Sequence, residues 1–208
     1  MLSTLPTPIR VSPADLLSIP SIDAIIAKIT ETVDTDLQFD IDNLQKTHLL
    51  RNRLETVDGS LSRVTRRRRH YLMMVAVPAY RKSLTRLLLG DHTLSVERLR
   101  YPSRYRLTIP RAQRLCRFCL ADVEDEVHAL LICEAQPTLV DLREQFLSDA
   151  FLNDRELEAA AGMLSSHDFL CRLVSSRKIV ARLAKYVHEV LIFFDRFQRY
   201  IAPGFHTP

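Results

Sequence analysis

The chain has 208 residues, of which 47% are hydrophobic, and a net charge of +4. A chain of this length can bury a core without disulfides, so we expect one ordinary domain, or a small domain with an appendage. Its 4 glycines stand far apart, which excludes the glycine-rich phosphate loops of Rossmann and P-loop proteins. The longest charge-free run, residues 70–80, is too short to span a bilayer, and the first ten residues lack the basic region of a secretory signal. The composition therefore predicts a soluble intracellular protein.

Charge is strongly segregated along the chain. Residues 51–119 carry 17 basic and 4 acidic side chains, a net charge of +13, whereas residues 120–168 carry 2 basic and 12 acidic side chains, a net charge of −10. A basic block of this size attracts polyanions, so we expect a nucleic-acid partner, RNA or DNA, and a nuclear location. In the alternative, the acidic and basic blocks pair with each other inside the fold and leave a mixed surface.

The first part of the chain predicts a lead-in followed by helices. Residues 1–20 hold four of the ten prolines, and we expect this lead-in to be disordered. Residues 21–77 are the predicted N-terminal helical segment. Within it, helical spacing of apolar residues predicts one helix over residues 21–33 and a second over residues 40–57, and an arginine run follows at residues 66–69.

Residues 78–110 are predicted to form a basic helix and an extended linker. Pro78 at the start and Gly90 at the end are typical of a short helix. In residues 98–109 apolar side chains alternate with arginines, so an extended strand would place a row of guanidinium groups on one face. The first part of this stretch could instead finish a helix that begins at Leu94.

The basic block supplies the residues that we expect to contact phosphates. They lie in the arginine run, in the alternating stretch and beside the first cysteines. These predicted nucleic-acid-binding residues are Arg66, Arg67, Arg68, Arg69, Arg98, Arg100, Arg104, Arg106, Arg111, Arg114 and Arg117. Three aromatic residues of the same region, Tyr101, Tyr105 and Phe118, are expected to pack the neighbouring module, and they could also stack on bases.

Three cysteines and a histidine carry the one chemical motif of the chain. Cys116, Cys119, His128 and Cys133 have the spacing C-x2-C-x8-H-x4-C within 18 residues, and a C-x2-C pair lets two thiolates approach one tetrahedral ion. We therefore predict one zinc ion in a CCHC module over residues 111–137. Four protein ligands leave no open position, so the zinc would be structural. In the alternative, these are free cysteines buried in a helical core.

The ligand spacing sets a geometric condition. On an ideal α-helix Cys133 would point about 140° away from His128. It can bind the same ion only if the helix ends there and curls back, which Pro137 favours. Three thiolates and one Zn²⁺ leave a net charge of −1, and Arg111, Arg114 and Arg117 are the expected compensating charges.

The remaining residues are predicted to be helical. Residues 138–202 form a C-terminal helical bundle whose last helix, about residues 176–201, has a broad apolar stripe, and residues 203–208 form a tail. His167 and Cys171 have a ligand-like spacing, but no second pair accompanies them, so we expect them in the core. The fold class is mainly α: an irregular helical bundle with one small zinc-knuckle module.

No catalytic motif is visible. The sequence has no adjacent pair of aspartates, no H-E-x-x-H and no G-x-S-x-G, so we predict that the chain is not an enzyme.

The motifs of the middle region also occur together in one known family. In order, they are residues 84–92 (LTRLLLGDH), residues 109–111 (IPR), residues 114–119 (RLCRFC), residues 124–133 (EDEVHALLIC) and the pair Leu142 and Arg143. They resemble the C-terminal zinc-binding region of non-LTR (LINE-type) retrotransposon reverse transcriptases.

The resemblance covers roughly residues 80–150. It implies that Cys116, Cys119, His128 and Cys133 are zinc ligands, and that the region helps to hold element RNA or target DNA. The polymerase palm and any endonuclease domain are missing, so the resemblance implies a derived tail without a polymerase active site.

The sequence thus predicts a nucleic-acid-binding zinc protein. The rival hypothesis is a helical protein-interaction module in which the zinc only stabilises the scaffold.

Overall fold

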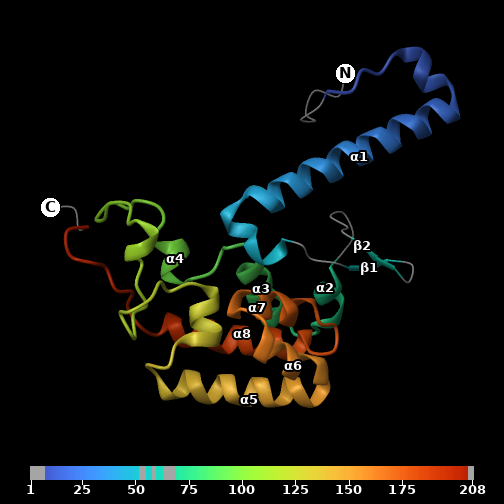
Figure 1. The fold of residues 1–208 in the computed structure, drawn as a ribbon. Helices are drawn as coiled ribbons and strands as arrows, with labels where there is room; N and C mark the ends of the chain where they lie inside the picture. The colour runs from blue at the N-terminus through green and yellow to red at the C-terminus, as the bar shows by residue number, and fades with distance from the viewer. Residues whose placement is uncertain (1–7, 52–54, 58–59, 63–68, 206–208) are drawn as a thin grey trace. The chain divides into compact units, whose positions relative to one another are not determined.

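The computed structural model describes residues 8–51, 55–57, 60–62 and 69–205. The chain divides into two compact units, Met1–Arg68 and Arg69–Pro208, and each is described by itself (Figure 1). Most of the described residues are helical, which confirms the mainly α prediction. None of the helices among them is both long and apolar enough to cross a membrane.

The first unit is built around one long helix. The 3-10 helix η1 (Pro13–Leu17) lies within the predicted disordered lead-in, and Ser12 and Asp15 cap it reciprocally. Helix α1 (Ile19–Asn43) and the 3-10 helix η2 (Gln45–Leu50) follow.

The unit ends in a short hairpin of β1 (Glu55–Val57) and antiparallel β2 (Ser60–Ser62), with Thr56 opposite Leu61. The predicted helix over residues 40–57 is therefore wrong. Its first residues finish α1, and its last are β1, where the β-branched Thr56 and Val57 suit a strand. Arg66, Arg67 and Arg68 lie outside the described residues.

The second unit contains the remaining helices. In chain order they are α2 (His70–Met74), α3 (Pro78–Leu88), α4 (Ser95–Arg98), the 3-10 turn η3 (Arg111–Gln113), the π-helical turn η4 (His128–Ile132), α5 (Pro137–Asn153), α6 (Arg155–Met163), α7 (Ser166–Ser175) and α8 (Val180–Asp195). The predicted helix from Pro78 to Gly90 is confirmed by α3. After the C-cap residue Leu89, Gly90 has φ of 59°, a conformation that glycine adopts without strain.

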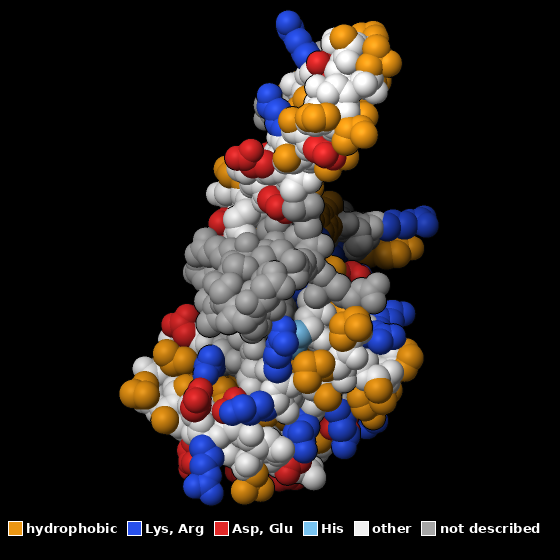
Figure 2. Space-filling model, turned by 90° about the vertical axis from the view of Figure 1, so that its right-hand side faces the viewer, with side chains coloured by type: hydrophobic (Ala, Val, Ile, Leu, Met, Phe, Trp, Pro, Cys, Tyr) orange, Lys and Arg blue, Asp and Glu red, His pale blue; other side chains and the backbone are white. Residues whose placement is uncertain are grey.

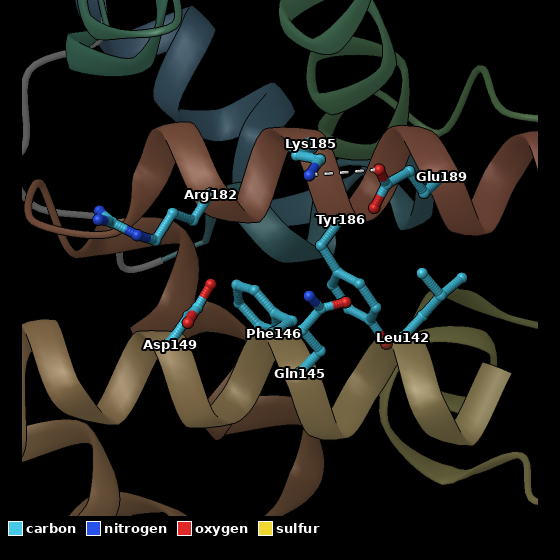
Figure 3. A pocket seen from close by; sticks show the side chains of 8 residues that line it. All are labelled: Leu142, Gln145, Phe146, Asp149, Arg182, Lys185, Tyr186 and Glu189. Carbon is cyan, nitrogen blue, oxygen red and sulfur yellow. Dashed lines mark ion pairs between the residues drawn. The ribbon is translucent and has the colours of Figure 1, made fainter. Parts of the chain in front are cut away.

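Helix α8 is the centre of this unit. It contacts α3, α5 and α7, and its buried residues form the predicted apolar stripe: Val180, Leu183, Ala184, Tyr186, Val187, Val190, Leu191 and Phe194. Against α5, the rings of Phe146 and Tyr186 stack with centroids 4.5 Å apart (Figure 3). Charged residues, including the Lys185–Glu189 ion pair, border this contact. The helix is shorter than predicted and ends at Asp195.

The stretch after α4 is not a strand. Ile109 N–H donates to the Leu99 carbonyl at 3.3 Å and closes a loop, in which both of these apolar side chains are buried while Tyr101 and Tyr105 are exposed. The extended alternative, with its face of guanidinium groups, is therefore wrong. Arg106 instead turns inward and donates to the carbonyls of Arg98 and Tyr101, which gives these main-chain oxygens the partners that a strand ladder would otherwise supply. The other alternative, a helix that begins at Leu94 and takes in the first part of this stretch, agrees with α4, for which Leu94 is the N-cap and which ends at Arg98.

Candidate metal centre

A tight loop positions the first two cysteines. It begins after η3, where Leu115 and Val123 form an isolated antiparallel bridge and Cys116 N–H donates to the Asp122 carbonyl at 2.8 Å. The loop turns sharply between them: Leu120 has φ of 55°, and its N–H donates to the Cys116 carbonyl at 3.0 Å. This turn brings the Cys116 and Cys119 side chains to the same side of the loop.

A π-helical turn positions the other two ligands. The Asp125 carboxylate accepts a hydrogen bond from the His128 N–H at 3.0 Å and caps the start of the turn. Cys133 N–H then donates to the His128 carbonyl at 2.8 Å, which is the i to i+5 bond of a π-helix. This wider turn brings residues five apart closer to the same side of the helix, and it reduces the angular separation that an α-helix would impose.

The four ligand atoms meet at one point. They all lie within 4.8 Å of one another, with the Cys116 and Cys133 sulfurs 3.8 Å apart and the Cys119 sulfur 3.4 Å from His128 Nε2. Three of the residues are buried and Cys119 is half-buried. Cys116, Cys119, His128 and Cys133 could therefore hold one metal ion, as predicted, and within the described ranges no other cluster of His, Cys, Asp or Glu does so.

Electrostatics within the cluster favour a cation. The hydrogen bond between the two thiols, together with burial, raises the pKa of Cys116 to about 12, whereas the same bond lowers the pKa of Cys133. Burial opposes protonation of His128, but the nearby sulfurs of Cys116 and Cys119 outweigh it and raise the pKa of the imidazole. The buried thiols lie close enough to share protons. A soft divalent cation fits such a cluster, because it replaces those protons when it binds.

The main chain supports the thiolate forms. Main-chain groups of Phe118 and Cys119 act to lower the pKa of Cys116, against its thiol partner and burial, and that of Ala135 helps to lower the pKa of Cys133. Main-chain hydrogen bonds to ligand atoms fix their orientation and stabilise their charge.

Two side chains outside the motif satisfy the carbonyls of the π-helical turn. Arg143 on α5 is buried and donates to the carbonyls of Leu130 and Cys133, and the Tyr186 hydroxyl on α8 donates to the Leu130 carbonyl as well. Carbonyls at a buried helix end need such partners. Neither residue was expected to support the site. The sequence did contain a clue to the role of Arg143, because this charged residue interrupts an otherwise apolar face of α5 between Leu139 and Phe146.

Arg117 ties the cysteine loop to the core. Its guanidinium donates to both carboxylate oxygens of Glu124 and to the carbonyls of Thr93, Phe194 and Phe197. The Arg117 and Glu124 side chains are only 2% and 0% exposed. Phe118 follows the arginine and packs against three phenylalanines, Phe193, Phe194 and Phe197, which agrees with a packing role for this ring.

Three of the predicted nucleic-acid-binding arginines are therefore structural. Arg106, Arg114 and Arg117 use their guanidinium groups on carbonyls or on Glu124 inside the unit, and burial lowers the pKa of Arg106 and of Arg114. The prediction that Arg106, Arg114 and Arg117 face phosphates is corrected accordingly, because these groups replace missing main-chain hydrogen bonds.

The other predicted arginines differ in exposure and partners. Arg98 and Arg104 are exposed; Arg100 is half-buried and pairs with Glu97 at 3.3 Å; Arg111 pairs with Asp125 at 2.7 Å; Arg69 is half-buried.

The expected charge compensation also differs from the prediction. Arg111, Arg114 and Arg117 bond to carboxylates or carbonyls, as described above, and Arg143 instead donates to the main chain of the ligand Cys133. On the face that Figure 2 shows, Lys and Arg side chains stand in separate groups among hydrophobic and acidic ones. The described residues on that face therefore form no continuous basic surface.

Cys171 lies apart from the metal cluster. It is half-buried on α7, its sulfur is 4.0 Å from His167 Nδ1, and burial raises the pKa of the thiol. The predicted core position is thus only partly correct, since His167 is on the surface.

Comparison with known proteins finds no protein family, no curated protein and no solved structure that matches this chain.

Proposed function

We propose that this chain is a nucleic-acid-binding zinc protein, with one structural zinc ion on Cys116, Cys119, His128 and Cys133. The convergence of four buried or half-buried ligand atoms within 4.8 Å carries the proposal. Three sulfurs and one imidazole nitrogen are the donor set that zinc prefers in closed tetrahedral sites. With four protein ligands no position remains for a reacting water, so we propose a scaffold role and no catalysis.

A zinc ion would also account for the buried Arg143. Zn²⁺ with three thiolates has a net charge of −1, and the guanidinium of Arg143 donates to the carbonyl of the ligand Cys133. A cation beside an anionic metal centre in a buried environment is favourable. The charge of Arg143 would therefore offset the net charge of a zinc–thiolate centre.

The nucleic-acid part rests on the charge of the segment around the cysteine loop. Residues 98–121 contain seven arginines and no acidic residue, and of these Arg98, Arg104 and Arg111 are exposed. We propose that these three contact phosphates of RNA or DNA together with Arg100 and the arginine run of residues 66–69. By its resemblance to the retrotransposon family, the chain would be a derived tail that holds RNA or target DNA in the nucleus.

Salt dependence tests this function. The logarithm of the binding constant should fall linearly with the logarithm of salt concentration, with a slope of about −5 on duplex DNA and about −4 on single strands for about six phosphate contacts. Replacing Arg98 and Arg104 by alanine should flatten the slope by about 1.5. The matched control replaces Arg155 and Arg182, two exposed arginines of α6 and α8, and should leave the slope unchanged. No binding at about 50 mM salt would refute the proposal.

A second candidate function is protein binding, in which zinc only stabilises a helical scaffold. Internal pairing of opposite charges, as in Arg117 with Glu124 and Arg111 with Asp125, favours it. These pairs neutralise part of the basic block against the acidic block that follows it. The same titration distinguishes the two functions, because a protein-binding scaffold shows no salt-dependent affinity for oligonucleotides.

A further inference from the structure

A tight turn over residues 103–106, between α4 and η3, exposes two tyrosines. Tyr101 and Tyr105 flank the turn, with 56% and 69% of their surfaces exposed. Large aromatic side chains usually bury most of their surface in a core or an interface. A pair of them on one short turn therefore needs an explanation beyond packing.

The turn is held from within. Ser103 and Arg106 exchange main-chain hydrogen bonds of 2.8 and 3.2 Å, and the buried Arg106 side chain donates to the carbonyls of Arg98 and Tyr101 at 3.1 and 2.7 Å. Its base is fixed by the bond of 3.3 Å between Ile109 N–H and the Leu99 carbonyl. The backbone that carries the two rings is thus anchored to the unit before any ligand arrives.

Each tyrosine has an arginine beside it. The Arg104 guanidinium carbon lies 5.4 Å from the centroid of the Tyr105 ring, and that of Arg100 lies 5.9 Å from the centroid of the Tyr101 ring. Arg104 is exposed and Arg100 is half-buried. The surface of the turn therefore combines aromatic faces with positive charge. Residues 98–121 contain no acidic residue, and the carboxylate of Glu97, just before them, is paired with Arg100 at 3.3 Å.

From this arrangement we infer that the turn is a stacking platform for unpaired bases, and that the nucleic acid bound here is single-stranded. The inference rests on the proposed nucleic-acid function and names its substrate class. Every base has a π-face, so stacking on tyrosine is tolerant of sequence, while the neighbouring arginines contact the backbone. In a duplex each base is stacked between its neighbours. The arginines of the turn could therefore contact duplex phosphates, but the tyrosines would find no exposed base to stack on.

The absence of tryptophan from the chain provides a direct test. Tyr105→Trp introduces the only indole, and its fluorescence should be quenched when a single strand of about 16 nucleotides, DNA or RNA, stacks on it. Leu152→Trp is the control, because Leu152 is 79% exposed on α5, away from the turn in the sequence. The control should bind the same strand without quenching.

Affinity measurements complete the test. Tyr105→Ala should weaken binding of the single strand by about 5-fold to 100-fold, whereas Tyr105→Phe should retain most of it and Leu107→Ala, at a neighbouring exposed side chain, should change it little. All variants should bind the matching duplex like the unaltered protein. Zinc content and thermal unfolding check that each variant is folded.

The outcomes separate the two proposals. If the unaltered protein binds strands and duplex, but Tyr105→Ala binds both equally well and the introduced indole is not quenched, the stacking platform is refuted while the nucleic-acid function stands. If the unaltered protein binds neither nucleic acid, both are refuted. Quenching confined to single strands, with the loss of affinity in Tyr105→Ala and not in Tyr105→Phe, establishes the platform.

Discussion

Arg117 and Glu124 form a buried ion pair that joins the cysteine loop to the end of helix α8. Arg117 lies between the first two candidate ligands and Glu124 shortly before His128, so the pair closes the loop across the candidate site. The remaining donors of Arg117 reach the carbonyls of Thr93, Phe194 and Phe197. Glu124 in turn accepts from the Ser95 N–H and hydroxyl at 2.8 and 2.9 Å. The charges are thus fully hydrogen-bonded inside the unit.

Removal of one member of this pair should destabilise the protein strongly. Arg117→Ala leaves Glu124 buried without its counter-ion, so the free energy of unfolding should fall by about 3–5 kcal/mol. Urea unfolding of the metal-loaded protein measures this loss. Arg111→Ala is the matched control, because Arg111 is exposed where it pairs with Asp125, and it should cost less than about 1 kcal/mol. Equal losses in the two variants would contradict a structural role that is special to Arg117.

Metal stoichiometry tests the centre itself. The protein purified with zinc should contain about one zinc ion per chain, and Cys119→Ser should lose it and unfold at least residues 111–137, because metal binding and local folding are coupled. Elemental analysis and circular dichroism measure the two effects. Cys171→Ala should keep the metal and cost about 1 kcal/mol in stability. Loss of zinc from this control would show that the ligand set is wrong.

The sequence predicted the candidate ligands but not how the chain brings them together. Spacing alone identified Cys116, Cys119, His128 and Cys133, because a C-x2-C pair with a following histidine and cysteine has few other uses. The π-helical turn that aligns His128 with Cys133 has no local signature, since its hydrogen bonds depend on Arg143 and Tyr186 from α5 and α8.

The wrong prediction for Arg106, Arg114 and Arg117 has a related cause. Arginines of residues 98–117 alternate with apolar side chains whether the chain is extended or looped, and periodicity therefore could not show that Arg106 turns inward. Only tertiary contacts show that Arg114 donates to the carbonyls of Ile109 and Val96. By contrast, Pro78 and Gly90 mark the two ends of their helix through local backbone preferences, so the sequence predicted this helix correctly.

Acid should weaken, through Asp154, the contact between the α5–α6 turn and the connection from α7 to α8. Its buried carboxylate accepts hydrogen bonds from Ser176 at 2.8 Å and Lys178 at 3.1 Å. Burial opposes ionisation, but these two partners outweigh it and lower the pKa of Asp154. Because the folded pKa is lowered, the stabilisation is complete above the unfolded pKa of about 4 and is lost as the pH falls through the folded value.

Asp154→Asn tests this dependence. The variant should lose about 1–2 kcal/mol at neutral pH, and its stability should fall less steeply than that of the unaltered protein below about pH 4. Urea unfolding across this pH range gives both numbers. Asp141→Asn, at an exposed position of α5, should stay within about 0.5 kcal/mol of the unaltered protein. Parallel pH profiles for Asp154→Asn and the unaltered protein would contradict the assignment.

The left-handed residue of the cysteine loop gives the last prediction. Leu120 has φ of 55° and is 47% exposed, so its side chain contributes little burial while its backbone occupies a region that costs an L-residue about 1–2 kcal/mol. Glycine has no such cost. Leu120→Gly should therefore be more stable than Leu120→Ala by about 1 kcal/mol, in the reverse of the usual order. Ala159→Gly within α6, also exposed, should show the usual order and lose about 1 kcal/mol. Thermal unfolding of the zinc-loaded variants measures each difference, and a Leu120→Ala variant as stable as Leu120→Gly would mean that the turn adopts another conformation when the metal is bound.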